Sequence, residues 1–333
     1  MQAREGSRSG DESAVGGLGP WPISDERGRS RMKWRKLGLV FRVAGQHEWM
    51  LTHATLPIAV RIGDSSYRVY FSGRDERNRS HVSYVELDIR RPTEILSIAE
   101  KPALAPGPLG FFDDHGVYAS SILEEGGRLL MYYIGWNPGV RGALFYSSIG
   151  LAESKDGGET FQKRSVAPIL ACSEYDPCLV TATSVMVDNG LWRMWYISGF
   201  KWEEDETGLH SLYHVKYAES EDGISWQRTG RVCIELRPGE RNIGRPYVVK
   251  ENGAYKMWYS YNEGAGYRIG YAESPDGYDW ARLDDQAGIT ISESGWDSEA
   301  VAHPWVFTHE GQRHMLYNGN GFGREGFGLA VVD

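Results

Sequence analysis

Short apolar and aromatic runs recur along the chain at a nearly constant distance, and polar or glycine-containing turns separate them. Five of these runs close on a tyrosine, namely Tyr70, Tyr133, Tyr196, Tyr259 and Tyr317, at intervals of 63, 63, 63 and 58 residues. A period of this length indicates one supersecondary unit that is copied along or around an axis.

One copy, at residues 117–164, contains four segments typical of β-strands. They are predicted at 117–123, 129–134, 148–153 and 160–164; each is short, rich in aromatic and β-branched residues and bounded by turn-forming residues. The turn between the third and fourth segments recurs as Ala-Glu-Ser-x-Asp-Gly at 152–157, 218–223 and 272–277. No window of comparable length has apolar residues at a spacing of 3.6, so few helices are expected.

Four-stranded sheets repeated around an axis form a β-propeller, here with five blades. The last copy ends with its third strand, at 327–332, and its fourth strand is expected at the N-terminus, because the Trp-containing segment 34–37 resembles 226–229 and 280–283. Residues 32–40 should therefore pair beside 327–332 and close the ring. The alternative is an open solenoid, which would need capping units that the sequence lacks.

The expected fold is thus an all-β, five-bladed β-propeller of four-stranded antiparallel blades, formed by one domain at residues 32–333. Residues 1–31, rich in Gly, Ser, Arg and Glu, are expected to be a disordered extension. The net charge of −9 argues against nucleic-acid binding. No apolar run approaches the roughly 20 residues of a membrane span. A signal-peptide core is also missing, so a cytoplasmic location is expected.

Cysteine and metal motifs give little chemistry. Cys172 and Cys178 share one loop and could form a disulfide, but free thiols are expected for these two and for Cys233 in a reducing compartment. There is no CxxC pair and no HExxH motif, so neither a metal site nor a cofactor is predicted. No spacing of candidate ligands in the sequence supports a calcium ion in the central channel of the expected propeller.

Loop length distinguishes the two faces of the predicted propeller. Turns between the first two and the last two strands of a blade are short and uniform, whereas the other connections are long and varied. These long connections share one face, where binding and catalysis concentrate on a rigid scaffold. They lie at residues 73–80, 136–147, 200–212, 262–266, 318–326, 102–116, 168–181, 234–245 and 289–302.

The long connections carry carboxylates, histidines, arginines and tryptophans, a mixture suited to a sugar. Two carboxylates can act as general acid and base across a glycosidic bond, and the candidates are Asp114 with Glu299 or Asp297, with Glu240 in reserve. Any one of these acids could instead cap a loop. The candidate substrate-binding residues are His53, Arg74, Asp75, His115, Tyr118, Trp136, Asp176, Arg245, His303 and Asn318.

The segment Ser-Lys-Asp-Gly-Gly-Glu-Thr-Phe at 154–161 resembles the Asp-box of sialidases and related propellers. It lies in a turn between the third and fourth strands, on the face opposite the long loops. We therefore expect Asp156 to cap backbone N–H groups of its own turn, and Asp222 and Asp276 to do the same.

The blade pattern, with Met-Trp-Tyr-Ser at 257–260 and Tyr-Arg-Ile-Gly-Tyr-Ala at 267–272, resembles the five-bladed glycoside hydrolases over nearly all of residues 32–333. These include the arabinanase and xylosidase type, the invertase type and the mannoside phosphorylase type. Their catalytic triads do not carry over. Leu56 stands before Pro57 where the arabinanase type has its base Asp, Thr181 falls at its acid Glu, and the invertase-type Asn-Asp-Pro-Asn-Gly is missing.

The phosphorylase type implies an anion site made by Arg, His and Lys side chains. Arg245, Arg241, His53, His115 and His303 could form one, since the arginine fork matches phosphate or carboxylate oxygens. The leading hypothesis is an intracellular enzyme that cleaves or transfers a glycosidic bond, with an acidic or phosphorylated sugar as a candidate substrate. The alternatives are a non-catalytic carbohydrate-binding protein on a hydrolase scaffold and a protein-interaction propeller.

Overall fold

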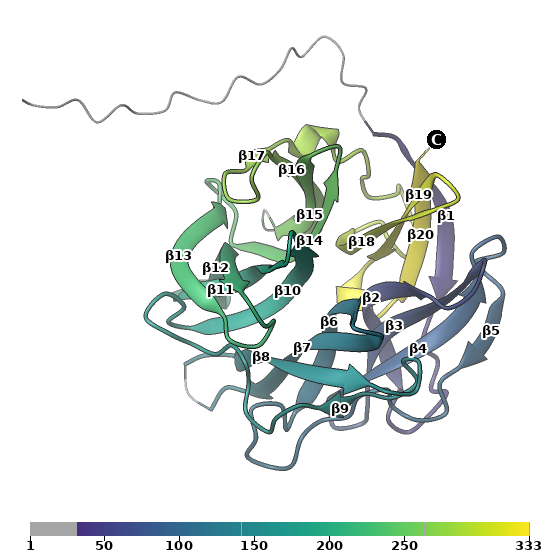
Figure 1. Ribbon diagram of the computed structural model, residues 1–333, viewed down its shortest axis with the longest axis horizontal. Coiled ribbons are helices and arrows are strands. Elements are labelled where there is room, and N and C mark those ends of the chain that lie inside the picture. The colour runs from purple at the N-terminus through teal and green to yellow at the C-terminus, as the bar shows by residue number, and fades with distance from the viewer. Residues whose placement is uncertain (1–31, 141, 263, 265, 333) are drawn as a thin grey trace, which may run out of the picture. The chain divides into compact units, whose positions relative to one another are not determined.

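The computed structural model describes residues 32–140, 142–262, 264 and 266–332, and it confirms the all-β prediction (Figure 1). The described residues form β-strands and two short 3₁₀ helices, η1 (Asp284–Gln286) and η2 (Gly321–Gly323). The prediction made for residues 1–31 lies outside the described part of the chain.

Strands that follow one another along the chain pair antiparallel in groups of four. The first group has β2 (Thr52–Arg61), β3 (Ser66–Arg74), β4 (Ser80–Asp88) and β5 (Ile95–Ile98). The second has β6 (Gly116–Glu125), β7 (Arg128–Pro138), β8 (Phe145–Ser154) and β9 (Gln162–Lys163). The third has β10 (Leu179–Asp188), β11 (Leu191–Asp205), β12 (Gly208–Ser220) and β13 (Gln227–Ile234).

Two groups remain, and the last of them uses a strand from the other end of the chain. The fourth group has β14 (Asn242–Glu251), β15 (Ala254–Asn262), β16 (Tyr267–Ser274) and β17 (Ala281–Arg282). The last joins β18 (Ala302–His309), β19 (Gln312–Asn318) and β20 (Phe327–Val332) to β1 (Trp34–Phe41), which pairs antiparallel with β20. In Figure 1 the first strand of each group lies innermost, around a common centre.

The tyrosine period is shifted by one residue in the first repeat. Tyr70, Tyr132 and Trp195 each donate a hydrogen bond to a glycine carbonyl in a turn of the next group, at 2.6, 2.7 and 2.8 Å. Tyr70 is therefore equivalent to Tyr132, and Phe71 is the residue equivalent to Tyr133. The first repeat has two adjacent aromatic residues, Tyr70 and Phe71, and the interval of 63 joins Tyr133 to the one that is not its equivalent.

The periodic tyrosines of the other four repeats share a different contact. Each hydroxyl donates to a carboxylate with little solvent exposure, which also pairs with a cation from the strand that completes the group. The sets are Tyr133, Asp113 and Lys163; Tyr196, Asp176 and Arg228; Tyr259, Asp284 and Arg282; and Tyr317, Asp297 and Lys36. Removing Lys163 or Lys36 would leave Asp113 or Asp297 uncompensated in the interior, at a cost of about 3–5 kcal/mol, whereas Asp176 and Asp284 would keep a second cation, Lys216 or Arg237. Because Lys36 lies on β1, the N-terminal strand makes the contact that β9, β13 and β17 make elsewhere.

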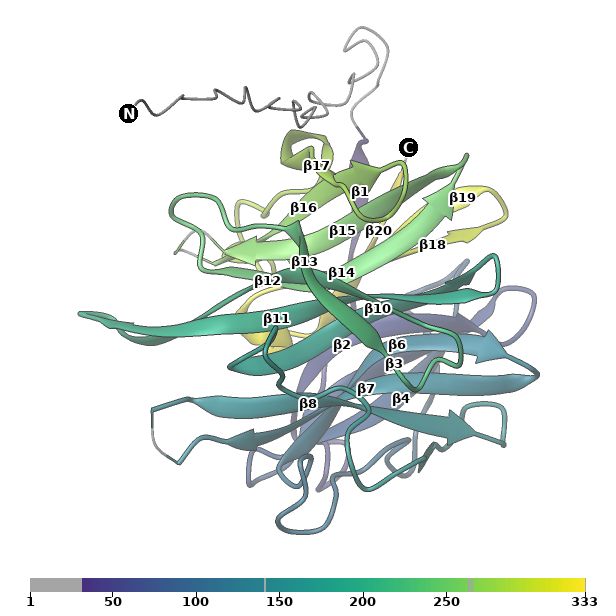
Figure 2. The same ribbon diagram turned by 60° about the vertical axis from the view of Figure 1, so that its left-hand side comes forward.

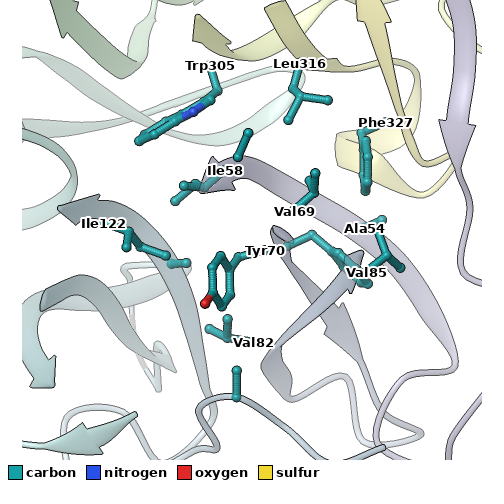
Figure 3. Packing of buried hydrophobic residues seen from close by; sticks show 14 of the residues in the cluster. Ala54, Ile58, Val69, Tyr70, Val82, Val85, Ile122, Trp305, Leu316 and Phe327 are labelled. Carbon is teal, nitrogen blue, oxygen red and sulfur yellow. The ribbon is translucent and has the colours of Figure 1, made fainter. Parts of the chain in front are cut away.

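Apolar side chains fill the space between neighbouring groups. Figure 3 shows part of one such cluster, in which Ile58 and Tyr70 of the first group pack with Ile122 of the second and with Trp305 and Phe327 of the last. Ile58, Tyr70 and Phe327 are fully buried. This packing fixes the positions of the innermost strands around the centre.

Candidate functional site

In each innermost strand the pairing with the second strand of its group shifts register, and the shifts fall at similar positions along the five strands. The shifts fall between residues 55 and 58, 119 and 121, 181 and 183, 244 and 247, and 302 and 305. Three of them contain a residue followed by proline, and that residue has a positive φ: 57° at Leu56, 51° at Arg245 and 55° at His303. Such φ values are uncommon for residues other than glycine, and a bulge re-aims a side chain at a functional site.

The re-aimed side chains border a single cavity of about 310 Å³. Every group contributes a residue of its first strand to the lining: Leu56, Tyr118, Ala182, Arg245 and His303. The cavity thus lies where the innermost strands converge. Residues of the long connections, where a site was expected, also line it.

Arg245 is the most informative residue of the cavity. Its side chain is buried, with a relative exposure of 2%, and it donates from Nη1 to the carbonyl oxygen of Ser120. Its Nε and Nη2 atoms have no hydrogen-bond partner among the described residues. The guanidinium lies 5.5 Å from the ring centroid of Trp305. Burial lowers the pKa of Arg245 to about 9, so the group still carries a positive charge at neutral pH.

Arg74 brings a second cation to the same cavity. Its Nη1 donates to Asn78 Oδ1 at 2.7 Å and its Nη2 to the Tyr118 hydroxyl at 3.0 Å, while the buried Nε has no partner within the described chain. His53 lies close to this arginine. Burial, followed by the charges of Arg74 and Arg324, lowers the pKa of His53 to about 4.

His303 is held in one orientation by Asn318. Its Nδ1 lies 2.9 Å from Asn318 Oδ1, which also accepts from the Leu56 N–H at 2.9 Å, and Asn318 Nδ2 donates to the carbonyls of Ala54 and Gly326. Because Asn318 Oδ1 only accepts, Nδ1 carries the hydrogen and Nε2 has the free lone pair. Burial lowers the pKa of His303 to about 4, so the ring is neutral at pH 7.

Aromatic residues form much of the remaining wall. The hydroxyl oxygens of Tyr213 and Tyr267 lie 2.9 Å apart, and burial raises the pKa of both groups, which keeps them neutral. Trp136 donates from Nε1 to Ser80 Oγ at 2.8 Å and stacks on Tyr118, with ring centroids 6.4 Å apart. Ring faces of this kind pack well against the C–H face of a sugar.

The structure brings together half of the predicted substrate-binding residues. Arg74, Tyr118, Trp136, Arg245 and His303 line the cavity. Three others lie directly behind this lining. They are Asn318, bonded to His303, His115, packed edge-to-face on Trp136, and His53, beside Arg74.

Asp75 and Asp176 are engaged elsewhere. Asp75 accepts hydrogen bonds from Arg79 and His81 and from the N–H groups of its own loop. Asp176 is fully buried and pairs with Arg228 and Tyr196. Both carboxylates stabilise the loops that carry them.

The four candidate acid–base residues do not line the cavity. Asp114 accepts from the Gly110 N–H and from Asn137 Nδ2, at 2.7 and 3.0 Å, and so caps its loop. Asp297 is 2.7 Å from Lys36 Nζ. Glu240 makes two bonds to Arg282, at 2.7 and 2.8 Å. Glu299 is exposed. Among the described residues, the lining contains no Asp or Glu.

The Asp-box-like turns have the structural role expected of them. Asp156 accepts from Ser154 Oγ and from the N–H and hydroxyl of Thr160, at 2.8, 3.0 and 2.5 Å. Although burial raises the pKa of Asp156, these bonds bring it down to about 2. Asp222 and Asp276 accept the same kind of bonds within their own turns.

Several cavity residues were not predicted, including Leu56, Phe145, Tyr213, Tyr267 and Phe322. One signal was available for Leu56: it precedes a proline at the opening of a blade, as Arg245 and His303 do. The other four lie in long connections or next to them, and no motif distinguishes them there.

Three further observations bear on the earlier expectations. All three cysteines are free thiols, as predicted. Within the described ranges no cluster of three or more His, Cys, Asp or Glu side chains is arranged to hold a metal ion. None of the described helices has the length and apolar character needed to cross a membrane.

Solved structures with the same fold are glycoside hydrolases. One described as a glycoside hydrolase has a TM-score of 0.67 at 19% identity and is matched over 90% of this chain and 92% of its own. A thermostable family-43 glycoside hydrolase has a TM-score of 0.62 at 18% identity, over 84% and 89%. A third, from work on glycoside hydrolases among the GH130 mannoside phosphorylases, has a TM-score of 0.65 at 15% identity, over 91% and 94%. The fold is that of the propeller glycoside hydrolases.

The chain belongs to the family of the uncharacterized protein Rv1502 of Mycobacterium tuberculosis, with which it is 42% identical over 304 residues, 91% of this chain and all of that protein. The 1,2-beta-oligomannan phosphorylase of Thermoanaerobacter sp. is 29% identical over 168 residues, 44% of this chain and 52% of that protein. No family model matches the chain.

Proposed function

We propose that residues 32–333 form a five-bladed propeller closed by β1, and that its central cavity binds a carbohydrate with an anionic group, such as a phosphate or a carboxylate. One observation carries the proposal: the buried guanidinium of Arg245 has two donor nitrogens, Nε and Nη2, that find no partner among the described residues, and it borders a cavity with aromatic walls. A buried charge without a partner is costly, and an anion would compensate it through charge-assisted hydrogen bonds.

The other lining residues fit the two parts of such a ligand. Arg74 adds a second positive charge, and phosphate carries a charge of about −1.5 to −2 at neutral pH. Trp136 and Tyr118 offer ring faces to the sugar. Neutral His303 accepts a hydrogen bond from a sugar hydroxyl at Nε2. The Tyr267 hydroxyl, bonded to that of Tyr213, can act as a hydrogen-bond donor or acceptor.

Binding titrations test this proposal. Calorimetry is expected to show glucose 6-phosphate or glucuronate binding at least about tenfold more tightly than glucose, because each charge-assisted hydrogen bond adds about 1.5–3 kcal/mol. Replacing Arg74 with Gln should reduce this preference. Arg241→Gln is the matched control, since Arg241 pairs with Asp205 away from the cavity lining, and it should leave the preference intact. Equal affinity for charged and neutral sugars would contradict an anion site.

The pH profile of anion binding gives a second prediction. Inorganic sulfate keeps its charge over the working range, so the protein alone sets the profile. Affinity should stay constant from pH 6 to 8, because His53 and His303, with pKa values of about 4, remain neutral there. It should rise below pH 5 as these rings gain protons, and fall above pH 9 as Arg245 loses its proton. A transition between pH 6 and 7, followed by calorimetry, would show that another group governs binding.

A second candidate function is cleavage of the bound sugar by phosphorolysis, and the phosphorylase relative together with the anion site favours it. In that reaction a phosphate oxygen attacks the anomeric carbon, the glycosidic C–O bond breaks, and the leaving oxygen takes a proton from a carboxylic acid. Arg245 and Arg74 would hold the phosphate. The proton donor would be a loop carboxylate, with Asp114 and Glu299 as our candidates; neither lines the cavity, so the substrate would have to extend beyond the lining to reach one of them.

Product analysis separates the two candidates. Incubation with 1,2-β-linked oligomannosides, with and without phosphate, would show phosphate-dependent release of a mannosyl phosphate if the chain is a phosphorylase. Binding without release in either condition would select the non-catalytic carbohydrate-binding function.

A further inference from the structure

The cavity changes character from its buried end to its mouth. Arg245, Ser260 and His303 are buried, with exposures of 2%, 0% and 5%, and they are polar. Leu144 and Phe322, which line the same cavity, are 58% and 42% exposed and apolar. Phe322 joins the two parts, since its ring packs edge-to-face on His303 with centroids 4.9 Å apart and lies 6.0 Å from the Arg74 guanidinium. A ligand that fills the cavity therefore meets donors and positive charge at the buried polar residues and hydrocarbon toward Leu144 and Phe145.

The apolar end extends onto two hairpins. Phe145 of β8 lines the cavity, and its ring packs edge-to-face on Trp202 of β11, with centroids 5.7 Å apart. Figure 2 shows the β11–β12 hairpin reaching well beyond the neighbouring strands. On the β7–β8 hairpin, Val140 and Tyr146 are 91% and 47% exposed. Exposed apolar residues thus continue from the mouth of the cavity along the hairpin that carries Phe145.

This mouth is poorly suited to another sugar unit. A sugar hydroxyl needs a hydrogen-bond partner when it leaves water, and an unpaired one is costly. Leu144, Phe145 and Phe322 offer none through their side chains, and Trp202, which packs on Phe145, offers only its indole N–H. Clustered exposed apolar residues at a cavity mouth instead mark a binding surface for an apolar group.

We propose that the mouth formed by Leu144, Phe145, Trp202 and Phe322 is a subsite for an apolar aglycone, so that the ligand is an anionic sugar joined to an alkyl or aryl group. The inference rests on the proposed anion site, which fixes the polar end of the ligand at Arg245. It names the chemical class of the other end.

Alkyl phosphates of increasing length test the subsite, measured by calorimetry below their micelle concentrations. Inorganic phosphate and methyl phosphate report on the anion site alone. From methyl to hexyl phosphate, each added methylene should tighten binding by up to about fourfold, as expected for transfer of a CH₂ group from water to an apolar surface. Hexyltrimethylammonium has a similar chain with the opposite charge, and it should not bind.

Two variants make the test specific. Leu144→Gln should reduce the gain in affinity per methylene, and it should weaken hexyl phosphate binding more than methyl phosphate binding. Leu109→Gln is the matched control, because Leu109 is 95% exposed and does not line the cavity, and it should behave as the wild type. Both positions are exposed, so neither change threatens the fold.

The outcomes separate the two proposals. If neither inorganic nor methyl phosphate binds, the anion site itself is wrong. If they bind and hexyl phosphate binds no more tightly, the anion site stands and the aglycone subsite is refuted. Equal binding of hexyltrimethylammonium would also refute it, since the mouth would then be a non-specific apolar surface.

Discussion

Replacing Arg245 with methionine is expected to weaken anion binding at least about 100-fold, because two charge-assisted hydrogen bonds are lost. The same change should raise the free energy of unfolding of the unliganded protein by about 1–4 kcal/mol, the range seen when buried charged groups are replaced by apolar ones. The lost bond to the Ser120 carbonyl offsets only about 1 kcal/mol of this gain. Methionine keeps an unbranched chain beside Trp305. Urea unfolding and phosphate titration measure the two effects.

The sign of the stability change follows from the pKa of Arg245. Burial holds it at about 9 in the folded protein, below the ordinary value of 12.5, so the folded state disfavours the charged form. The resulting penalty is fully present below pH 9 and disappears as the pH rises from about 9 toward 12.5. Unfolding should therefore be compared at pH 7 to 8, where the penalty that methionine removes is complete.

Arg282→Met is the contrasting variant. Arg282 pairs with Glu240, whose side chain is only 1% exposed, so its removal leaves an uncompensated carboxylate and should cost about 3–5 kcal/mol. Opposite signs for the two arginines would show that Arg245 is kept for a ligand and Arg282 for the fold. If Arg245→Met were as destabilising as Arg282→Met, Arg245 would be a structural residue and the anion site would lose its main support.

The strand pattern could be predicted from the sequence because its signals are local. Turn residues at 189–190 and 252–253, and the Ala-Glu-Ser-x-Asp-Gly turns, mark strand ends wherever they occur. Even the pairing of β1 with β20 followed from a local match between short segments. The equivalence of Tyr70 with Tyr132 did not, since it depends on which neighbouring turn the hydroxyl reaches across the molecule.

The candidate site was predicted only in part, because charge in a loop does not indicate its partner. Asp176 and Asp297 lie in the expected loops, but each is engaged by a tyrosine 20 residues downstream. Asp113 and Tyr133 have the same spacing. This repeated interval was visible in the sequence and would have identified these carboxylates as structural. Loop carboxylates next to them, such as Asp114, do not share it.

Arg245 and His303 were predicted from the chemistry of their side chains in the long connections, and their positions share a feature that this prediction did not use. Arg245 and His303 each precede a proline at the opening of a blade, and so does Leu56. Proline has no N–H group to give to the strand ladder, so the pairing breaks there. The preceding residue has a positive φ at all three positions, whereas a residue before proline ordinarily favours extended backbone with a negative φ. The bulge turns that residue toward the centre. Its identity therefore sets the chemistry of the cavity: in this chain two of the three positions can bind an anion or a hydroxyl.

Replacing Asn318 with alanine is expected to lower the free energy of unfolding by at least about 3 kcal/mol. Asn318 is fully buried and bonds to the Leu56 N–H, the His303 ring and the carbonyls of Ala54 and Gly326. Alanine leaves these groups without a partner, and each buried unsatisfied group costs about 1–3 kcal/mol. Sugar binding should weaken as well, since His303 loses the bond that fixes its tautomer and ring orientation.

Asn320→Ala provides the matched control two residues away. Asn320 accepts from the N–H groups of Glu299 and Ala300 through Oδ1 and donates from Nδ2 to the Gly295 carbonyl and the Ser298 hydroxyl. These bonds lie in a partly exposed loop where water can replace them, so the cost should be within about 1.5 kcal/mol. Urea unfolding compares the two variants, and titration with glucose 6-phosphate and with inorganic phosphate separates sugar from anion recognition. The proposed binding mode places His303 at the sugar hydroxyls and Arg245 at the anion, so Asn318→Ala should weaken binding of glucose 6-phosphate more than binding of phosphate. Equal loss for both ligands would mean that Asn318 supports the cavity as a whole and that His303 has no distinct role in binding the sugar.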